Sequence, residues 1–342
     1  MESRETSKPK KMIRVKKRFY IFMTLLLLCF LIPFSVLYFK PFTKNLSLSI
    51  PIGKDAIIQQ CNQQLLIYDA GNLLLLDNGK VKYTLPLTAK KPALALNGNK
   101  AYFASGKTLT IIDNEGKIEN TLSYEENLSW LSVKNNDLFL FFPRNVKKHQ
   151  KDRDILYPLN GMPVSLAANS KNIWIVQLSQ QNQQFKSQLS VFTPDGKLYF
   201  TFSFFDEVME YIAAGVDNEY YFLTDKNLFH FKDMNLINKK PLLRLSAVAE
   251  NDHDLAYIDY QKVVRVHKGT GNIDEFYTSD TFTGLVLNQE DILLYRQNGY
   301  IILRNGQTIL TDLNRTNILS AFTYQDSFYL VHENGIEKIS WK

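Results

Sequence analysis

From residue 45 onward the chain alternates short apolar runs with polar turns, and no stretch shows the periodicity of an amphipathic helix. The runs are rich in Leu, Ile, Val, Tyr and Phe and are separated by Asn, Asp and Gly, which is typical of antiparallel strands joined by tight turns. The clearest unit predicts four strands, over 92–96, 100–104, 108–113 and 117–123.

This four-strand unit repeats with a period of about 37 residues. The polar turn between the first and second strands serves as a marker. It falls at Asn62, Gly98, Asn136, Lys171, Asn218, Asp252, Gln289 and Gln325, with intervals of 36, 38, 35, 47, 34, 37 and 36 residues. The long interval contains a polar hairpin extension at 180–188. Eight near-equal units predict an all-β, eight-bladed β-propeller over residues 45–342.

The last unit supplies only three strands, over 318–324, 327–331 and 336–341. Residues 45–51, NLSLSIP, alternate strictly, and we expect this strand to join the last blade, cover its open edge and close the ring. Residues 143–154, PRNVKKHQKDRD, show no convincing third strand, so seven blades are the alternative. A β-sandwich or β-helix explains eight such units less well.

Residues 19–39, FYIFMTLLLLCFLIPFSVLYF, form an apolar segment without a charged residue. As a helix these 21 residues span roughly 32 Å, close to the hydrocarbon thickness of a bilayer. Tyr20 and Tyr38 lie near its ends, at the depth of the interfacial aromatic belts. The segment is therefore predicted to be a single transmembrane helix.

The charges beside this segment predict its orientation. Residues 1–18 carry eight basic and two acidic residues, and 8 − 2 = +6 equals the net charge of the whole chain. The positive-inside rule places this basic tail in the cytoplasm, and the linker 40–44 and the propeller outside. No small-residue cleavage site follows, so 19–39 is predicted to be an uncleaved signal anchor of a single-pass cell-membrane protein. Cys29 follows Leu28 rather than a small residue, which disfavours a lipoprotein signal.

The remaining charge argues against a nucleic-acid partner. Residues 19–342 contain 40 − 8 = 32 basic and 34 − 2 = 32 acidic residues. A domain that binds DNA or RNA needs a basic face, which this balance does not favour. Cys61 is the one cysteine after the apolar segment, so no disulfide is predicted within the propeller.

The repeat pattern of residues 45–342 resembles the broad β-propeller superfamily of quinoprotein-like (PQQ-like) and WD-repeat-like domains. The third-to-fourth-strand turns Asp77-Asn78-Gly79-Lys80, Asn114-Glu115-Gly116-Lys117 and Pro194-Asp195-Gly196-Lys197 resemble one another. No motif of WD repeats, PQQ enzymes, kelch repeats or sialidases accompanies them. As a whole the chain is similar to N-terminally membrane-anchored bacterial propeller proteins of unknown function.

The sequence contains no motif that assigns a reaction, a metal or a cofactor. Its histidines, His149, His230, His253, His267 and His332, do not pair at metal-ligand spacing. The P-loop, G-x-S-x-G and G-x-G-x-x-G motifs are also absent. We therefore predict no metal and no cofactor, and the sequence assigns no catalytic residue.

The candidate binding residues are charged residues of connections expected on one face of the propeller, which carries the fourth-to-first and second-to-third strand connections. A basic group suits an anionic polymer, a lipid headgroup or an acidic partner. An acidic group complements it on the same rim. A solvated loop or turn is the alternative for both. These residues are Arg144, Lys147, Lys148, Lys151, Arg153, Glu125, Glu126, Asp206, Glu207 and Glu210.

Three functions fit these observations. The first is a non-catalytic binding or scaffold module that holds a protein or envelope polymer outside the membrane. The second is a carbohydrate hydrolase or lyase of the cell envelope that uses acids on the rim. The third is a sensor that works with a separate signalling partner, because an 18-residue tail is too short to form a signalling domain.

Overall fold

The structure is a computed structural model that describes residues 42–48 and 52–341, with gaps at 54, 62–63, 78–79, 152, 182–183, 217, 315–316, 325–326 and 334. The predicted basic tail 1–18 and the apolar segment 19–39 lie outside these residues. The predicted linker 40–44 overlaps the first strand, which begins at residue 42. Within the described part of the chain, no helix is long and apolar enough to cross a membrane.

The described residues form eight four-stranded antiparallel sheets, so the seven-bladed alternative is wrong. We number these blades in chain order. Blade 1 contains β2 (Ile57–Cys61), β3 (Gln64–Asp69), β4 (Asn72–Asp77) and β5 (Lys80–Pro86), and blade 2 contains β6 (Ala93–Asn97), β7 (Lys100–Ser105), β8 (Thr108–Ile112) and β9 (Ile118–Ser123). Blade 3 contains β10 (Trp130–Lys134), β11 (Asp137–Phe141), β12 (Asn145–Lys148) and β13 (Ile155–Pro158), and blade 4 contains β14 (Met162–Ala168), β15 (Ile173–Gln181), β16 (Gln184–Phe192) and β17 (Leu198–Phe205).

The second half of the chain repeats this plan. Blade 5 contains β18 (Met209–Ala214), β19 (Glu219–Thr224), β20 (Asn227–Lys232) and β21 (Asn235–Pro241), and blade 6 contains β22 (Leu245–Glu250), β23 (Asp254–Asp259), β24 (Lys262–His267) and β25 (Ile273–Tyr277). Blade 7 contains β26 (Gly284–Asn288), β27 (Asp291–Arg296), β28 (Gly299–Arg304) and β29 (Gln307–Asp312). The strand order of blade 8 is β1 (Phe42–Leu48), β32 (Gly335–Trp341), β31 (Ser327–His332) and β30 (Ile318–Tyr324).

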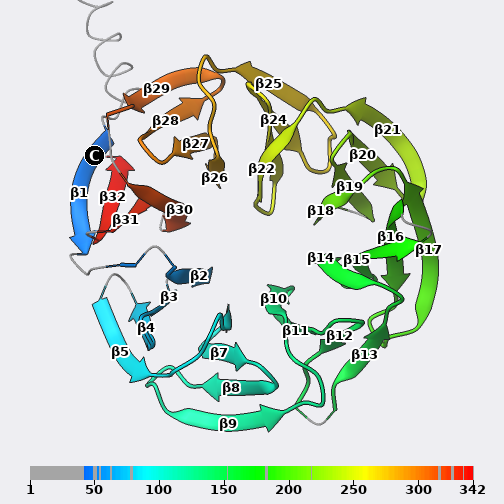
Figure 1. The fold of residues 1–342 in the computed structure, drawn as a ribbon. Coiled ribbons are helices and arrows are strands. Elements are labelled where there is room, and N and C mark those ends of the chain that lie inside the picture. Colours follow the sequence, from blue (N-terminus) through cyan, green and yellow to red (C-terminus); the bar gives the residue numbers. More distant parts are fainter. Residues whose placement is uncertain are drawn as a thin grey trace, which may run out of the picture. The chain divides into compact units, whose positions relative to one another are not determined.

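Residues Lys44–Ile339 make one compact unit. Figure 1 shows its sheets arranged in a ring, with the first strands of the blades at the centre and the fourth strands at the periphery. In blade 8, β1 contains residues 45–48 of the segment expected to complete the last blade, and it lies beside β32 in the strand order. Residues 49–51 of that segment lie outside the described residues.

The core lies between neighbouring blades because the middle strands are apolar on both faces. The second strand of blade 5 is buried along its whole length, and the fourth strand is mostly exposed. Between blades 4 and 5, the fully buried Trp174 contacts Tyr220, with ring centroids 5.4 Å apart. Each large side chain buried in this way stabilises the fold by about 1.5–3 kcal/mol. The ring is therefore held together by blade-to-blade packing.

The turns between third and fourth strands use the residues that the sequence indicated. In blade 2, Asp113 Oδ1 accepts hydrogen bonds from the backbone N–H groups of Glu115 and Lys117, and Gly116 has a φ of 85°. Gly196 adopts a φ of 93° at the equivalent turn of blade 4. Glycine takes this left-handed conformation without steric cost, and this explains the similar turns along the chain.

The third strand of blade 3 differs from the sequence expectation. Residues 143–154 showed no strand pattern, but they contain β12, and the following residues begin β13. Only Val146 of β12 is fully buried, and it pairs with the buried Tyr157 of β13. The strand was missed because one apolar residue among polar neighbours gives too little alternation to detect.

Candidate functional site

The predicted acidic residues come from two different blade connections. Glu125 and Glu126 lie between β9 and β10, Asp206 and Glu207 lie between β17 and β18, and Glu210 lies within β18. Glu126 accepts a hydrogen bond from Asn145 Nδ2 at 3.1 Å. These acids therefore belong to the predicted face, but they are distributed over the connections on both sides of blades 3 and 4.

Glu207 is bound by the turn of its own blade. Its two carboxylate oxygens accept hydrogen bonds from Thr224 Oγ1 at 2.8 Å and from Asn227 Nδ2 at 2.9 Å. The hydrogen bonds of Glu207 hold the connection between β19 and β20 in place, which is a structural role.

Burial, and then the charge of Asp225, raises the pKa of Glu210 above its ordinary value.

The predicted basic residues do not form one loop. Arg144 lies between β11 and β12, Lys147 and Lys148 lie in β12, and Lys151 and Arg153 lie between β12 and β13. Successive connections of an antiparallel sheet alternate between its two edges, so Lys151 and Arg153 lie on the face opposite to the predicted one.

The two lysines of β12 point to opposite faces of the sheet and have different contacts. The Nζ atom of Lys147 lies 5.2 Å from the ring centroid of Tyr124 and 5.0 Å from that of Phe142. Lys148 Nζ lies 2.7 Å from Asp137 Oδ2. The strand geometry therefore does not favour a single anion-binding patch of these five basic residues.

A repeated pair of an acidic and a basic side chain connects the second and third strands in four blades. The first residue of the second strand is acidic, and a basic residue of the third strand lies within 2.6–2.7 Å of it. The pairs are Asp137–Lys148, Glu219–His230, Asp254–Arg265 and Asp291–Arg304. These pairs lie beside the first-to-second-strand turns, where they fix the edge of each blade.

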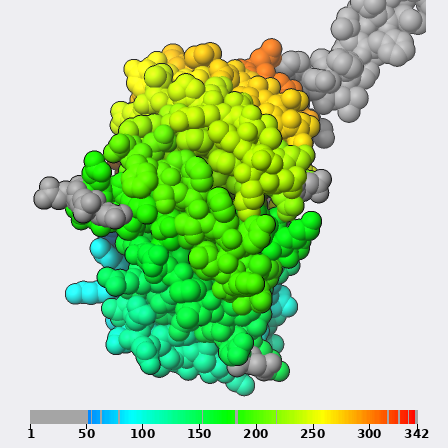
Figure 2. Space-filling view, turned by 90° about the vertical axis from the view of Figure 1, so that its right-hand side faces the viewer, coloured from blue at the N-terminus to red at the C-terminus, as the bar shows by residue number. Residues whose placement is uncertain are grey.

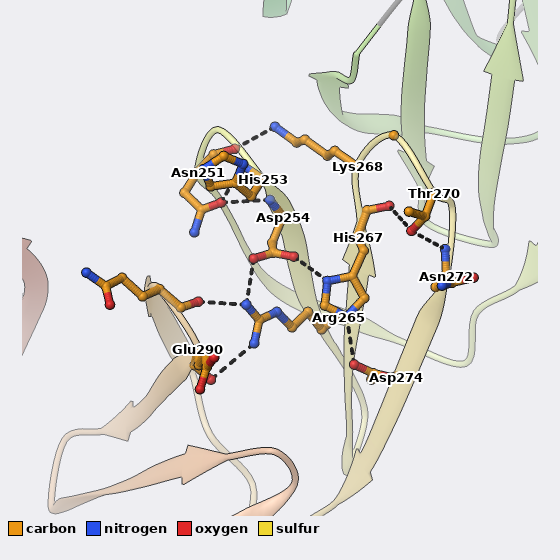
Figure 3. A network of polar contacts seen from close by, with 12 residues as sticks. Asn251, His253, Asp254, Arg265, His267, Lys268, Thr270, Asn272, Asp274 and Glu290 are labelled. Carbon is orange, nitrogen blue, oxygen red and sulfur yellow. Dashed lines mark hydrogen bonds and ion pairs between the residues drawn. The ribbon is translucent and has the colours of Figure 1, made fainter. Parts of the chain in front are cut away.

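In blade 6 this ion pair extends into a network that reaches the next blade (Figure 3). The buried Asp254 accepts hydrogen bonds from Arg265 at 2.6 Å and from His267 Nδ1 at 2.7 Å. Arg265 also donates to the backbone carbonyls of Gln289 and Glu290 in blade 7. Burial alone raises the pKa of Asp254, but Arg265 and His267 outweigh it, so the pKa lies below the ordinary value.

The same edge of the ring contains a polar cavity of about 440 Å³. Four consecutive blades line it with the ends of their innermost strands, so the cavity opens at the centre of the ring. We name it the channel cavity. Its polar lining residues are Lys134, Asn135, Asn169, Glu250, Asn251, Asp252 and Lys268.

Three charged side chains meet in the channel cavity. Lys134 Nζ lies 2.6 Å from Glu250 Oε1, and Lys268 Nζ lies 3.0 Å from Glu250 Oε2. Lys268 also donates to the carbonyl oxygen of Asn251 at 2.8 Å. Lys134 belongs to blade 3 and the other two residues to blade 6, so this ionic cluster joins blades that are not neighbours in the ring.

The ionic cluster sets the protonation of its own residues. Burial raises the pKa of Glu250, but the charges and hydrogen bonds of Lys134 and Lys268 outweigh burial, so the pKa is lowered. Burial, and then the charge and hydrogen bond of Glu250, raises the pKa of Tyr211. At neutral pH Glu250 is therefore a carboxylate between two ammonium groups, and Tyr211 is a neutral hydrogen-bonding partner.

The sequence did not predict this cavity, because the candidate binding residues were expected in the fourth-to-first and second-to-third strand connections, on the other face of the ring. The sequence nevertheless contained a signal for this cavity, at the last residues of the first strands. The first strands of the eight described sheets end at Cys61, Asn97, Lys134, Ala168, Ala214, Glu250, Asn288 and Tyr324. Lys134 and Glu250 are the two charged residues in this set, and they are the two that pair across the channel cavity.

The described residues contain no group of three or more His, Cys, Asp or Glu side chains arranged to bind a metal ion. His253 lies in the turn between β22 and β23, where its backbone N–H donates to Asn251 Oδ1 at 2.8 Å. The turn residues therefore stabilise one another.

Comparison with solved structures places the chain among propellers. BamB from Moraxella catarrhalis has a TM-score of 0.63 and 14% identity, and the match covers 88% of this chain and 98% of that protein. The fold is that of a β-propeller. Saccharomyces cerevisiae Sqt1 has a TM-score of 0.63 and 8% identity over 87% of this chain and 99% of that chain. The WD40 domain of SCAP from fission yeast has a TM-score of 0.61 and 11% identity over 88% and 98%.

These similarities identify the fold without assigning a family. No protein-family model matches the chain, and no curated protein matches its sequence. The resemblance to PQQ-like and WD-repeat-like propellers, inferred from the repeat pattern, is confirmed at the level of the fold.

Proposed function

We propose that the chain is a non-catalytic binding module that takes a polar segment of a protein partner into the channel cavity. The observation that carries this proposal is the ion pair between Lys134 and Glu250, which holds two distant blades around a polar cavity. Charged groups that are already paired lose little freedom when a partner binds, so such a cavity is preorganised.

The chemistry of the lining favours a peptide segment. Asn135, Asn169 and Asn251 bring amide groups to the cavity, and amides match the donors and acceptors of a peptide backbone. The residues that line the cavity include no aromatic side chain on which a sugar ring could stack. A protein partner therefore fits better than an envelope polysaccharide, although the latter is the alternative that the test must distinguish.

The position of the module relative to the membrane is also part of the proposal. Residues 19–39 anchor the chain as a single transmembrane helix, residues 1–18 remain in the cytoplasm, and the propeller lies outside. The charge distribution supports this orientation. The strand order β1–β32–β31–β30 supports closure of the ring by the N-terminal strand. The ring then presents the channel cavity to an extracytoplasmic partner.

Site-specific photo-crosslinking in the full chain tests where the partner binds. A photoreactive amino acid replaces Asp252, which lines the channel cavity and is exposed. The matched control is Glu115, an exposed acidic turn residue in the third-to-fourth-strand connection of blade 2, on the same face of the ring. We expect a discrete crosslinked protein from position 252 and none from position 115.

The crosslink must also depend on the ionic cluster. Lys134→Met keeps the length of the side chain but removes its charge, so the yield from position 252 should fall at least several-fold. Identical products at both positions, or a yield that Lys134→Met leaves unchanged, would contradict the proposed site. A crosslinked product that a glycosidase degrades would favour the polysaccharide instead.

A further inference from the structure

The outer wall of blade 4 exposes an unusual number of aromatic side chains. β17 has the sequence LYFTFSFF, and Tyr199, Phe200, Phe202 and Phe205 are exposed along it, with Tyr199 reaching 67%. Phe185 of the neighbouring strand β16 is 64% exposed. Figure 2 shows the side of the ring on which the green segments of blades 4 and 5 lie. Successive side chains of a strand point to opposite faces, so Tyr199 and Phe205 lie on one face of this outer strand and Phe200 and Phe202 on the other. Water therefore contacts large apolar rings on both faces of β17.

β17 is also an edge strand. It is the last strand of its sheet, with β16 on one side and no strand of the described sheet on the other. The backbone N–H and C=O groups that point away from an edge strand are available to pair with another strand. A strand with this exposure and apolar composition therefore favours strand addition.

The other outer strands of the ring are protected against such pairing. Natural sheets protect their edges with charged residues and prolines. Such residues occur in every other outer strand of the described sheets: Lys44 in β1, Lys80 in β5, Glu119 in β9, Pro158 in β13, Lys239 in β21, Asp274 in β25 and Asp312 in β29. β17 contains neither a charged residue nor a proline. The absence of protection is therefore specific to blade 4.

We infer that β17 pairs antiparallel with β17 of a second copy of this chain. A twofold axis at Phe202 places Phe202 opposite the same residue of the second copy, Tyr199 opposite Phe205, and Phe200 opposite Phe204. Aromatic pairs of this kind stabilise antiparallel sheets, and the uncharged strand brings no like charges together. The strand is therefore complementary to itself.

The exposed area is sufficient for such an interface. With roughly 200 Å² for a whole aromatic side chain, the exposed fractions of Phe185, Tyr199, Phe200, Phe202 and Phe205 correspond to roughly 550 Å². A stable interface buries about 800 Å² on each partner. A paired strand brings rings together on both faces of β17, and these rings with the adjoining backbone approach that area.

Two double variants of the full chain test the pairing by sedimentation equilibrium in density-matched detergent. In the proposed register Thr201 lies opposite Ser203 of the second copy. Thr201→Lys with Ser203→Lys places like charges opposite each other twice and should weaken the dimer about tenfold or more. Thr201→Lys with Ser203→Glu places opposite charges together and should restore it. Thr121→Lys, on the outer strand β9, is the matched control and should leave the dimer unchanged.

The wild-type chain should sediment at twice the mass of one chain. A wild-type protein that remains monomeric, as it would if lipid or a different protein covered the wall, overturns the inference. So does a Lys/Lys variant that dimerises like the wild type, or a Lys/Glu variant that does not recover. Thermal unfolding of each variant identifies loss of fold. Pairing through β17 does not involve the channel cavity, so the crosslinking result and the sedimentation result can fail separately.

Discussion

Lys134 at the end of β10 and Glu250 at the end of β22 form an ion pair of 2.6 Å between Nζ and Oε1. The two residues are 116 positions apart in the chain and lie in blades 3 and 6. Glu250 holds Lys268 as well, and Lys268 has only 5% of its side chain exposed. The carboxylate is thus the shared counterion of two cations in the channel cavity.

Glu250→Gln should destabilise the fold because the substitution leaves the nearly buried Lys268 without a counterion. Removal of one partner from a buried pair costs about 3 kcal/mol. Urea unfolding measures this change in the free energy of unfolding. Glu119→Gln, whose partner Lys100 is exposed, is the matched control and should cost less than about 0.5 kcal/mol. Equal effects of the two variants would show that the ionic cluster has no special role.

The pH dependence of stability should depend on Asp254. Its pKa in the folded state lies below the ordinary value of 3.8, because Arg265 and His267 outweigh the effect of burial. The carboxylate therefore stabilises the fold above that value, and this contribution is lost as the pH falls through the folded-state pKa. Asp254→Asn should unfold more easily at neutral pH and should lose less stability on acidification.

Urea unfolding at a series of pH values from neutral downward checks this prediction. Asp252→Asn, two residues earlier on the exposed turn, is the control. In this variant the free energy of unfolding should change with pH as steeply as in the wild type. If the free energy of unfolding of Asp254→Asn also changes with pH as steeply as that of the wild type, the network in Figure 3 does not link stability to pH as described.

The basic segment of blade 3 allows a comparison of two nearby lysines. Lys148 Nζ lies 2.7 Å from Asp137 Oδ2 with 13% of its side chain exposed, whereas Lys151 is exposed. Lys148→Ala should lower the free energy of unfolding by about 1 kcal/mol, since the ion pair and the packed aliphatic stem are both lost. Lys151→Ala should change it by less than about 0.5 kcal/mol. Thermal unfolding distinguishes these outcomes, and the reverse order would contradict the assigned strand geometry.

Gly299 at the start of β28 should not tolerate a side chain. A Cβ atom there would lie 2.6 Å from the Cα atom of Leu313 and 2.7 Å from the carbonyl oxygen of Asp312. Because both contacts are to backbone, Gly299→Ala should destabilise the fold by about 2 kcal/mol. Gly98→Ala has open space but a φ of 57°, so its cost should be only about 1 kcal/mol. Denaturant midpoints of the two variants test this order.

Local patterns were sufficient to predict most of the fold. The turn markers from Asn62 to Gln325 depend on residues that are close together in the chain. Seven of the eight described sheets consist of four strands that follow one another in the chain, whereas blade 8 includes the N-terminal strand β1. Counting such units predicted eight blades with seven as the alternative, and the observed sheets decide for eight. β12 was missed because only Val146 among its four residues is fully buried, and burial comes from contacts with Tyr157 and the neighbouring blade.

The candidate site was much less accessible to prediction. The sequence indicated charged residues on one face, but it did not show that Glu207 is bound by Thr224 and Asn227 or that Lys151 lies on the opposite edge. The first fact depends on side-chain orientation, and the second depends on how successive strand connections alternate between the two faces of the ring.

The sequence by itself determined the repeated strand unit and the location of the net positive charge at the N-terminus, because these are properties of consecutive residues. Only the tertiary structure decided which side chains meet. Lys134 and Glu250 become neighbours because the ring brings the ends of separated inner strands to one centre. The rings of β17 become a surface because packing the blades buries the middle strands and leaves the outermost strand in water.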